Sequence, residues 1–256
     1  MVPKNGGKVK ACIMLSVALV VLLIGGCVPL PDVGEILSEV SITGSGIVVT
    51  QEFDLSGFDQ VEVSNAFDVE ISQGDQFSVV VRVDENVAEY LDVFKQGTTL
   101  RIGLKPHIYS MGNVGPLEAE VTMPRLTGLE ASGASGVSVT GFKSTEGLSV
   151  EVSGASSLRG DIEAGGVTVD VSGASDVELS GSGGDLVMDV SGAGTADLAD
   201  FQVGDASIEA SGASSATVNV SGRLDAEASG ASRILYLGNP TLGRIESSGA
   251  STIERG

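Results

Sequence analysis

The chain has 256 residues, 34 of them acidic and 14 of them Lys or Arg, which gives a formal net charge of −20. This balance excludes nucleic acid as a partner and argues against an anionic membrane surface, because phosphate groups are bound by clustered Lys and Arg side chains. The aromatic residues are seven Phe and three Tyr, with no Trp, and there are 36 Gly. A core in such a chain has to be filled by Val, Leu, Ile and Ala.

Two cysteines and a single histidine restrict the chemistry further. They are too few for a Cys/His zinc site or a disulfide framework. A Ser-His-Asp or Cys-His mechanism would have to use His107, which lies in a Pro- and Gly-containing stretch over residues 105–116. We expect His107 to be a solvated loop residue and the protein not to be an enzyme.

Residues 1–26 have the pattern of a secretory signal peptide. Three lysines precede a run of small and apolar residues over 11–24, which is shorter than the roughly 20 residues of a membrane-spanning helix. Residues 23–27, Leu-Ile-Gly-Gly-Cys, resemble a bacterial lipobox, in which the cysteine is acylated and becomes the first residue of the mature protein. This pattern predicts lipidation of Cys27.

The N-terminal pattern therefore predicts a protein of the cell envelope, outside the cytoplasm and attached to a membrane by its lipid. An uncleaved membrane anchor is the alternative, and it also places the rest of the chain outside the cytoplasm. Residues 27–40 contain Pro29 and Pro31, which favour extended backbone, so we predict a tether there.

A repeated tetrapeptide dominates the C-terminal half of the chain. Ser-Gly-Ala-Ser, with one Ser-Gly-Ala-Gly variant, recurs at intervals of 18 to 21 residues. The seven copies begin at Ser132, Ser153, Ser172, Ser191, Ser211, Ser229 and Ser248. Apolar residues alternate with mostly polar ones before each copy, as in Leu148, Val150 and Val152, which is typical of a strand buried on one face.

A repeat of about 19 residues is too short for a propeller blade or a pair of helices, and it suits one coil of a parallel β-helix. The tetrapeptide is predicted to form a corner of each coil. Gly supplies backbone freedom, Ala fits a cramped interior and Ser can bond to neighbouring backbone groups. A disordered linker is the alternative, which the alternating Val and Leu residues disfavour. We therefore predict an all-β, single-stranded parallel β-helix, a solenoid whose repeat coils span residues 127–256.

Residues 41–126 lack the tetrapeptide but keep the pattern of strands. The predicted strands span residues 46–53, 60–69, 77–83, 99–104 and 118–123. A short helix is predicted near residues 84–94, where Asp84 can cap the first turn and Val87, Tyr90 and Leu91 share a face. We expect these residues to form the first, less regular coils of one β-helix domain over 41–256, and a separate small β domain is the alternative.

Several motifs occur in a fixed order along the chain. They are residues 58–63 (Phe-Asp-Gln-Val-Glu-Val), 69–75 (Val-Glu-Ile-Ser-Gln-Gly-Asp), 84–87 (Asp-Glu-Asn-Val), 97–102 (Gly-Thr-Thr-Leu-Arg-Ile), 123–126 (Met-Pro-Arg-Leu) and the Ser-Gly-Ala-Ser series. Together, over roughly residues 46–256, they resemble the bacterial family called "putative auto-transporter adhesin, head GIN domain". The resemblance implies a right-handed β-helix on an exported, often lipid-anchored protein, and an adhesin-like role.

An acidic residue lies two places before each tetrapeptide. These residues are Glu130, Glu151, Asp170, Asp189, Glu209, Glu227 and Glu246. If the coils stack in register, their carboxylates form a row about 4.8 Å apart, which costs stability unless something offsets the repulsion. Hydration of a solvated face is one offset. Ca²⁺, which prefers oxygen ligands, and a cationic partner such as a basic protein or an amino-sugar polymer are the two alternatives.

We predict a non-catalytic, adhesin-like binding or structural module without a cofactor, Ca²⁺ being the only candidate ion. Its ligand would be a surface glycan or a protein, and residues 235–237 (Leu-Tyr-Leu) form either a binding patch or the packing of an end coil. The strand residues Thr252-Ile253-Glu254 have no capping segment after them, which predicts an open edge and homo-oligomers. A polysaccharide-acting enzyme is the remaining alternative, although the aromatic platforms that stack on sugars are missing.

Overall fold

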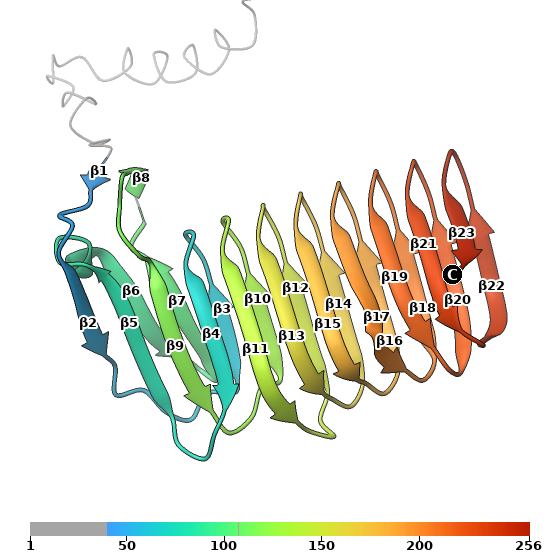
Figure 1. Cartoon of the computed structure of the whole chain (residues 1–256), viewed down its shortest axis with the longest axis horizontal. Helices are drawn as coiled ribbons and strands as arrows, with labels where there is room; N and C mark the ends of the chain where they lie inside the picture. Colours follow the sequence, from blue (N-terminus) through green and yellow to red (C-terminus); the bar gives the residue numbers. More distant parts are fainter. Residues whose placement is uncertain (1–39, 107) are drawn as a thin grey trace, which may run out of the picture. The chain divides into compact units, whose positions relative to one another are not determined.

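The computed structural model describes residues 40–106 and 108–256. The predicted signal peptide, Cys27, the tether up to residue 39 and His107 lie outside the described residues. The described part forms one compact unit, Val40–Gly256, built of stacked coils (Figure 1). Between residue 40 and the C-terminus, the described segments contain no helix with the length and hydropathy of a membrane span.

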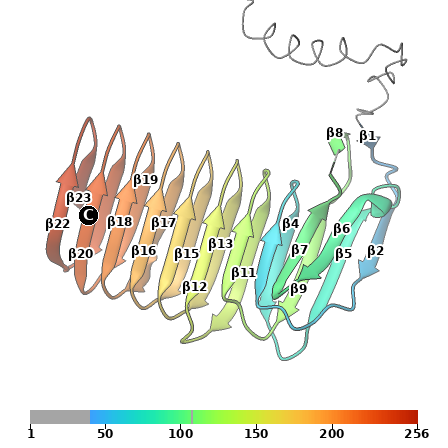
Figure 2. The ribbon, with the colours of Figure 1, turned by 180° about the vertical axis from the view of Figure 1, so that it is seen from behind.

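The coils place their strands in two facing sheets (Figures 1 and 2). Sheet 1 has ten strands in the order β22 (Thr241–Ser247), β20 (Arg223–Ala228), β18 (Ala206–Ala210), β16 (Leu186–Val190), β14 (Val167–Val171), β12 (Leu148–Val152), β10 (Gly128–Ala131), β3 (Gln60–Val63), β7 (Thr99–Leu104) and β6 (Leu91–Gln96).

Sheet 2 has eleven strands in the order β2 (Val48–Glu52), β5 (Ser78–Asp84), β9 (Glu118–Met123), β4 (Asp68–Gln73), β11 (Gly136–Lys143), β13 (Ser157–Glu163), β15 (Asp176–Ser182), β17 (Thr195–Val203), β19 (Ser215–Val220), β21 (Arg233–Gly238) and β23 (Thr252–Arg255). Strands β1 (Val40–Thr43) and β8 (Ile108–Gly112) pair with each other in a separate two-stranded sheet.

The prediction of parallel stacked coils is confirmed by the registers of the strands. Val150 pairs with Val169, which pairs with Met188, which in turn pairs with Ile208. All four side chains are at most 2% exposed. Equivalent apolar residues thus form continuous columns between the two sheets, and these columns are the core.

Each tetrapeptide forms the corner that leads from a strand of sheet 1 to a strand of sheet 2. Its Gly has a positive φ in every copy, between 66° and 79°. One part of the corner prediction is wrong, because the Ala is exposed and the fourth residue, Ser, faces the interior, as Ala155 and Ser156 show. The left-handed Gly turns the chain so that the next inward position falls on this Ser. Its buried hydroxyl is then satisfied by the backbone, as where Ser232 Oγ donates to the Ser229 carbonyl oxygen at 2.8 Å.

Apart from β1 and β8, the strands within residues 40–126 extend the same two sheets. Strands β3 and β4 pair in parallel with β10 and β11, and β7 and β9 lie on their far sides. The outermost strands β2, β5 and β6 run antiparallel to their neighbours. The expected first coils are therefore less regular because antiparallel strands close this end of the stack.

The predicted helix over 84–94 is wrong. The segment contains only a three-residue 3₁₀ helix, Ala88–Tyr90, because β5 continues to Asp84 and β6 begins at Leu91. Strand β6 forms a hairpin with β7 through Gly97, whose φ of 63° suits a tight turn. Val87 and Leu91 are buried against the core. A helix would have buried the same two residues, so the spacing of apolar residues did not distinguish a helix from the observed turn and strand.

Candidate functional site

The acidic residues before the tetrapeptides lie in one row across sheet 1. Strand pairing joins each of them to its equivalent on the next coil. In spatial order they are Glu130, Glu151, Asp170, Asp189, Glu209, Glu227 and Glu246. Glu62 of β3 pairs with Glu130 and extends the row. We call these eight residues the acidic ladder, and neighbouring coils place them about 4.8 Å apart.

The sequence analysis missed Glu62, although a signal for it exists. The segment Glu62-Val63-Ser64-Asn65-Ala66 has the same order as Glu-Val-Ser-Gly-Ala in the repeats, with Asn in place of Gly. Asn65 has a φ of 63°, like the repeat glycines, and Asn is one of the few other residues that tolerate this conformation. This segment is therefore a corner of the same kind.

Arginine side chains neutralise the two ends of the acidic ladder. At one end, Arg101 pairs with Glu62 in the strand register and donates to its carboxylate. At the other end, Arg244 contacts Glu227 at 3.1 Å and Glu246 at 2.7 Å. Within the described residues, no ion pair involves the five carboxylates between these ends. The five carboxylates in the middle of sheet 1 are thus left without an arginine or lysine partner among the described residues.

The pKa values of three ladder carboxylates are shifted by their burial and by the charges next to them. Burial of the carboxylate, followed by the charges of its two ladder neighbours, raises the pKa of Glu130. The same causes in the same order raise the pKa of Asp189. Hydrogen bonds from Arg244 lower the pKa of Glu246. Glu130 and Asp189 therefore hold protons more readily than Glu246 does.

The geometry of the acidic ladder determines which cations it could attract. Six of its carboxylates are exposed, and Glu62 and Glu130 are half-buried. Over residues 40–106 and 108–256, no group of three or more His, Cys, Asp or Glu side chains converges as metal ligands would. A flat row of this kind attracts cations collectively through its field, without a cage that surrounds one ion.

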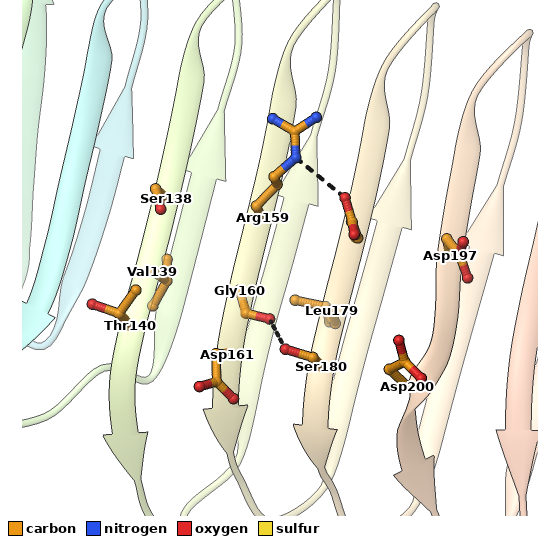
Figure 3. Close-up of a pocket in the computed structure, with 11 residues that line it drawn as sticks. Ser138, Val139, Thr140, Arg159, Gly160, Asp161, Leu179, Ser180, Asp197 and Asp200 are labelled. Carbon is orange, nitrogen blue, oxygen red and sulfur yellow. Dashed lines mark hydrogen bonds and ion pairs between the residues drawn. The ribbon is translucent and has the colours of Figure 1, made fainter.

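The outer face of sheet 2 carries two shallow depressions that share the side chains of Ser138 and Arg159. The larger, about 430 Å³, extends over β4, β9 and β11 and is bordered by Arg82. The smaller, about 230 Å³, extends over β13, β15 and β17 (Figure 3). We call the two together the sheet 2 groove. The sequence did not predict this groove, because the depth of each depression depends on which small residues are neighbours on adjacent coils.

Small side chains create the floor of the sheet 2 groove. Gly136 pairs with Ser157 in the larger depression, and Ser138 lies on the same outer face where the two depressions meet. Arg159 rises between the two depressions and contacts Glu178 at 3.2 Å, while Ser180 Oγ donates to the Gly160 carbonyl oxygen (Figure 3). The walls thus alternate hydroxyl, guanidinium and carboxylate groups.

Residues 235–237, the alternative binding patch, belong to β21 near the end of the stack. All three are half-buried. Tyr236 packs against the core, and Leu235 pairs with Glu254 of β23. These contacts are those of end-coil packing.

Comparison with known proteins locates the chain within a family. Residues 57–240 match the family model described as "Putative auto-transporter adhesin, head GIN domain". None of the curated proteins matches this sequence.

Solved structures share the fold at low sequence identity. A putative adhesin from Bacteroides fragilis has a TM-score of 0.76 at 20% identity, with 84% of this chain and 99% of that chain covered. A putative lipid binding protein from Parabacteroides distasonis has a TM-score of 0.70 at 20% identity and the same coverage. A putative adhesin from Parabacteroides merdae has a TM-score of 0.65 at 17% identity, covering 84% and 98%. On the strength of the family model, the chain belongs to the putative auto-transporter adhesin, head GIN domain family.

Proposed function

We propose that this protein is exported, anchored to a membrane of the cell envelope by a lipid on Cys27, and acts there as a non-catalytic, adhesin-like binding module. The family supports an adhesin-like role at the cell surface. Export and anchoring are supported by the order of residues 1–27, in which lysines, an apolar run and a lipobox-like segment follow one another.

The observation that carries the binding role is the sheet 2 groove. Its two depressions form one polar track across seven strands, with Arg82 and Arg159 between carboxylates and hydroxyls. Hydroxyl groups of a sugar can donate to carboxylates and accept from guanidinium groups at the same time. A polymer with many hydroxyls and no negative charge therefore fits this track, and the excess of acidic groups favours a neutral or amino-bearing surface glycan.

A second candidate function is a surface scaffold stabilised by cations. The continuity of the acidic ladder across eight strands favours it, because repulsion along the row would be relieved by any bound cation. A basic protein is the other partner that this row would attract. In this function the flat outer face of sheet 1 would be the binding surface, and the sheet 2 groove would not.

The lipid anchor is tested on the full chain expressed in a bacterial host. We expect the wild type to incorporate a labelled fatty acid and to partition with membranes. Cys27→Ala should abolish both, while Cys12→Ala, which lies in the predicted signal peptide, should leave them unchanged. Labelling of Cys27→Ala at the wild-type level would refute the anchor.

Binding is tested with residues 28–256, which contain the whole compact unit with its core. The protein is applied to an array of neutral, amino-bearing and acidic surface glycans. Arg159→Ala should weaken binding at least about tenfold, since it removes a charged hydrogen-bonding group worth roughly 1.5 to 3 kcal/mol. Arg233→Ala is the matched control, because Arg233 forms the same kind of exposed ion pair on sheet 2, with Glu254 at 2.6 Å, outside the groove.

The outcomes separate the two surfaces. Binding that is lost in Arg159→Ala and kept in Arg233→Ala supports the groove. Equal affinities in all three proteins would remove the groove from the function. A preference for amino-bearing glycans that is kept in Arg159→Ala and disappears in Asp170→Asn would move the function to the acidic ladder.

A further inference from the structure

The two ends of the coil stack differ in how they cover the core. At the N-terminal end, Val87 in the segment between β5 and β6 and Leu91, the first residue of β6, pack on the core with 0% and 9% of their surface exposed. At the C-terminal end, every residue of β22 is exposed. Leu242 is 50% exposed and Ile245 is 37% exposed. Ile47, Val48 and Phe94 are exposed at the N-terminal end, so both ends carry exposed apolar side chains, but those at the C-terminal end lie in a strand that is exposed along its whole length.

The exposed residues of β22 occupy core positions. Leu242 pairs with Leu224, and Ile245 pairs with Ala226. Both partners on β20 are buried, with 0% and 3% of their surface exposed. The columns that form the core thus continue into β22, where their side chains are exposed in the described unit, and exposed apolar surface of this kind is what an interface buries.

The same end carries unpaired strand edges. Strand β22 has only β20 as a neighbour in sheet 1, and β23 has only β21 in sheet 2. The outer backbone N–H and C=O groups of such edges are satisfied by another strand or by water. An occupant that covers this end fully needs two strand edges, held as far apart as the two sheets, with apolar side chains between them.

We propose that the occupant is a second copy of this chain, docked end to end in a two-fold symmetric dimer. A two-fold axis perpendicular to the sheets brings β22 against β22 of the second copy and β23 against β23, in both cases antiparallel. The second copy supplies two edges at the required separation and an equal apolar surface. A closed symmetric contact of this kind is isologous, so it ends at two copies and does not form a fibre.

The charges at this end support self-association. The chain has a net charge of −20, which opposes the approach of two copies. In β22 and β23, however, two arginines balance two glutamates: Arg244 and Arg255 against Glu246 and Glu254. With Ile245 opposite Ile245 of the second copy, antiparallel pairing places each Arg244 opposite a Glu246. The end is therefore self-complementary, unlike the acidic face of sheet 1.

The dimer is tested by analytical ultracentrifugation of residues 28–256 from about 1 to 100 µM, a range that spans micromolar affinities. We expect a twofold increase in mass with concentration. Ile245→Lys should keep the protein monomeric over the whole range. Val187→Lys is the matched control, because Val187 is 57% exposed and apolar in the middle of sheet 1, and it should dimerise like the wild type.

A charge exchange tests the register. Arg244→Glu and Glu246→Arg should each weaken the dimer, and the double variant should restore it, since every Arg again faces a Glu. Circular dichroism confirms that each variant is folded. A wild type that stays monomeric at all concentrations would overturn the proposal. A dimer that survives Ile245→Lys, or is lost in Val187→Lys, would overturn this end as the interface. Neither result bears on the sheet 2 groove.

Discussion

Gly173 lies against Gly154 of the preceding coil so closely that a Cβ atom on Gly173 would be 2.4 Å from the Gly154 carbonyl oxygen. The same corner contact recurs along the repeat, as between Gly192 and Gly173. Ala174 N donates to the Gly154 carbonyl oxygen at 2.9 Å, so the backbones of successive corners are hydrogen-bonded. The recurrence of Gly in the tetrapeptide follows from this contact and from its positive φ.

The first prediction concerns this corner. Gly173→Ala should lower the free energy of unfolding by at least about 1 to 2 kcal/mol, the cost of a left-handed Ala, with the backbone clash in addition. Gly166→Ala is the control, because a Cβ atom there would lie 3.8 Å from the nearest atom, the Asp185 carbonyl oxygen. Urea unfolding of both variants measures the difference, and equal stabilities would contradict the stacking explanation.

The second prediction concerns the buried corner serines. Ser232 is 2% exposed, and its hydroxyl donates to the carbonyl oxygens of Ser229 and Ala210 at 2.8 and 3.0 Å. Ser232→Ala should cost about 1 kcal/mol, which lowers the melting temperature by about 2 to 4 °C. Ser229→Ala, which keeps the accepting carbonyl, should be nearly neutral. A thermal melt that shows the same loss for both would mean that the buried hydroxyl does not stabilise the corner.

The third prediction concerns the pH dependence of the acidic ladder. The pKa values of Glu130 and Asp189 are raised in the folded protein, so the folded state binds protons more tightly than the unfolded state does. Stability from these groups is therefore present below their unfolded pKa and is lost as the pH rises through their folded pKa.

Replacing them with neutral amides should remove this loss. Glu130→Gln and Asp189→Asn should each raise the melting temperature at pH 7 by about 1 to 2 °C, after allowance for solvent screening. The gain should shrink as the pH falls and vanish below the unfolded pKa values, 4.5 for Glu130 and 3.8 for Asp189. Asp176→Asn, an exposed carboxylate on sheet 2, is the control and should show no such trend. A lower melting temperature for both ladder variants at pH 7 would contradict repulsion within the row.

The fourth prediction separates screening from a specific cation site. Because the ladder is a flat row, millimolar Ca²⁺ and Mg²⁺ should raise the melting temperature of residues 28–256 equally and slightly, relative to chelator. Circular dichroism monitors the three melts. A rise with Ca²⁺ alone, absent when Glu151, Asp170 and Asp189 are changed to Ser, would instead establish a calcium site on the ladder.

The coil follows from the pattern of residues along the chain. Alternating Val, Leu and Ile residues and a tetrapeptide every 18 to 21 residues leave one arrangement in which each strand buries one face. The same periodicity predicted that the seven acidic residues lie in one row, because register in a repeat follows from its length. Glu62 was missed since its corner uses Asn65 in place of Gly, a substitution that a literal repeat conceals.

Three features depend on residues that are neighbours in space and that the repeat does not specify. The segment over residues 84–94 has apolar residues that suit a helix, yet β6 pairs with β7 because their hairpin satisfies backbone groups at the edge of sheet 1. The sheet 2 groove arises where Gly136 and Ser138 of one coil lie beside Ser157 of the next on the outer face of the sheet. The exposed Leu242 and Ile245 occupy core positions on a strand that has one neighbour. The alternation of apolar and polar residues predicts whether a side chain faces the core or the solvent. The pairing of strands on adjacent coils determines which side chains it contacts.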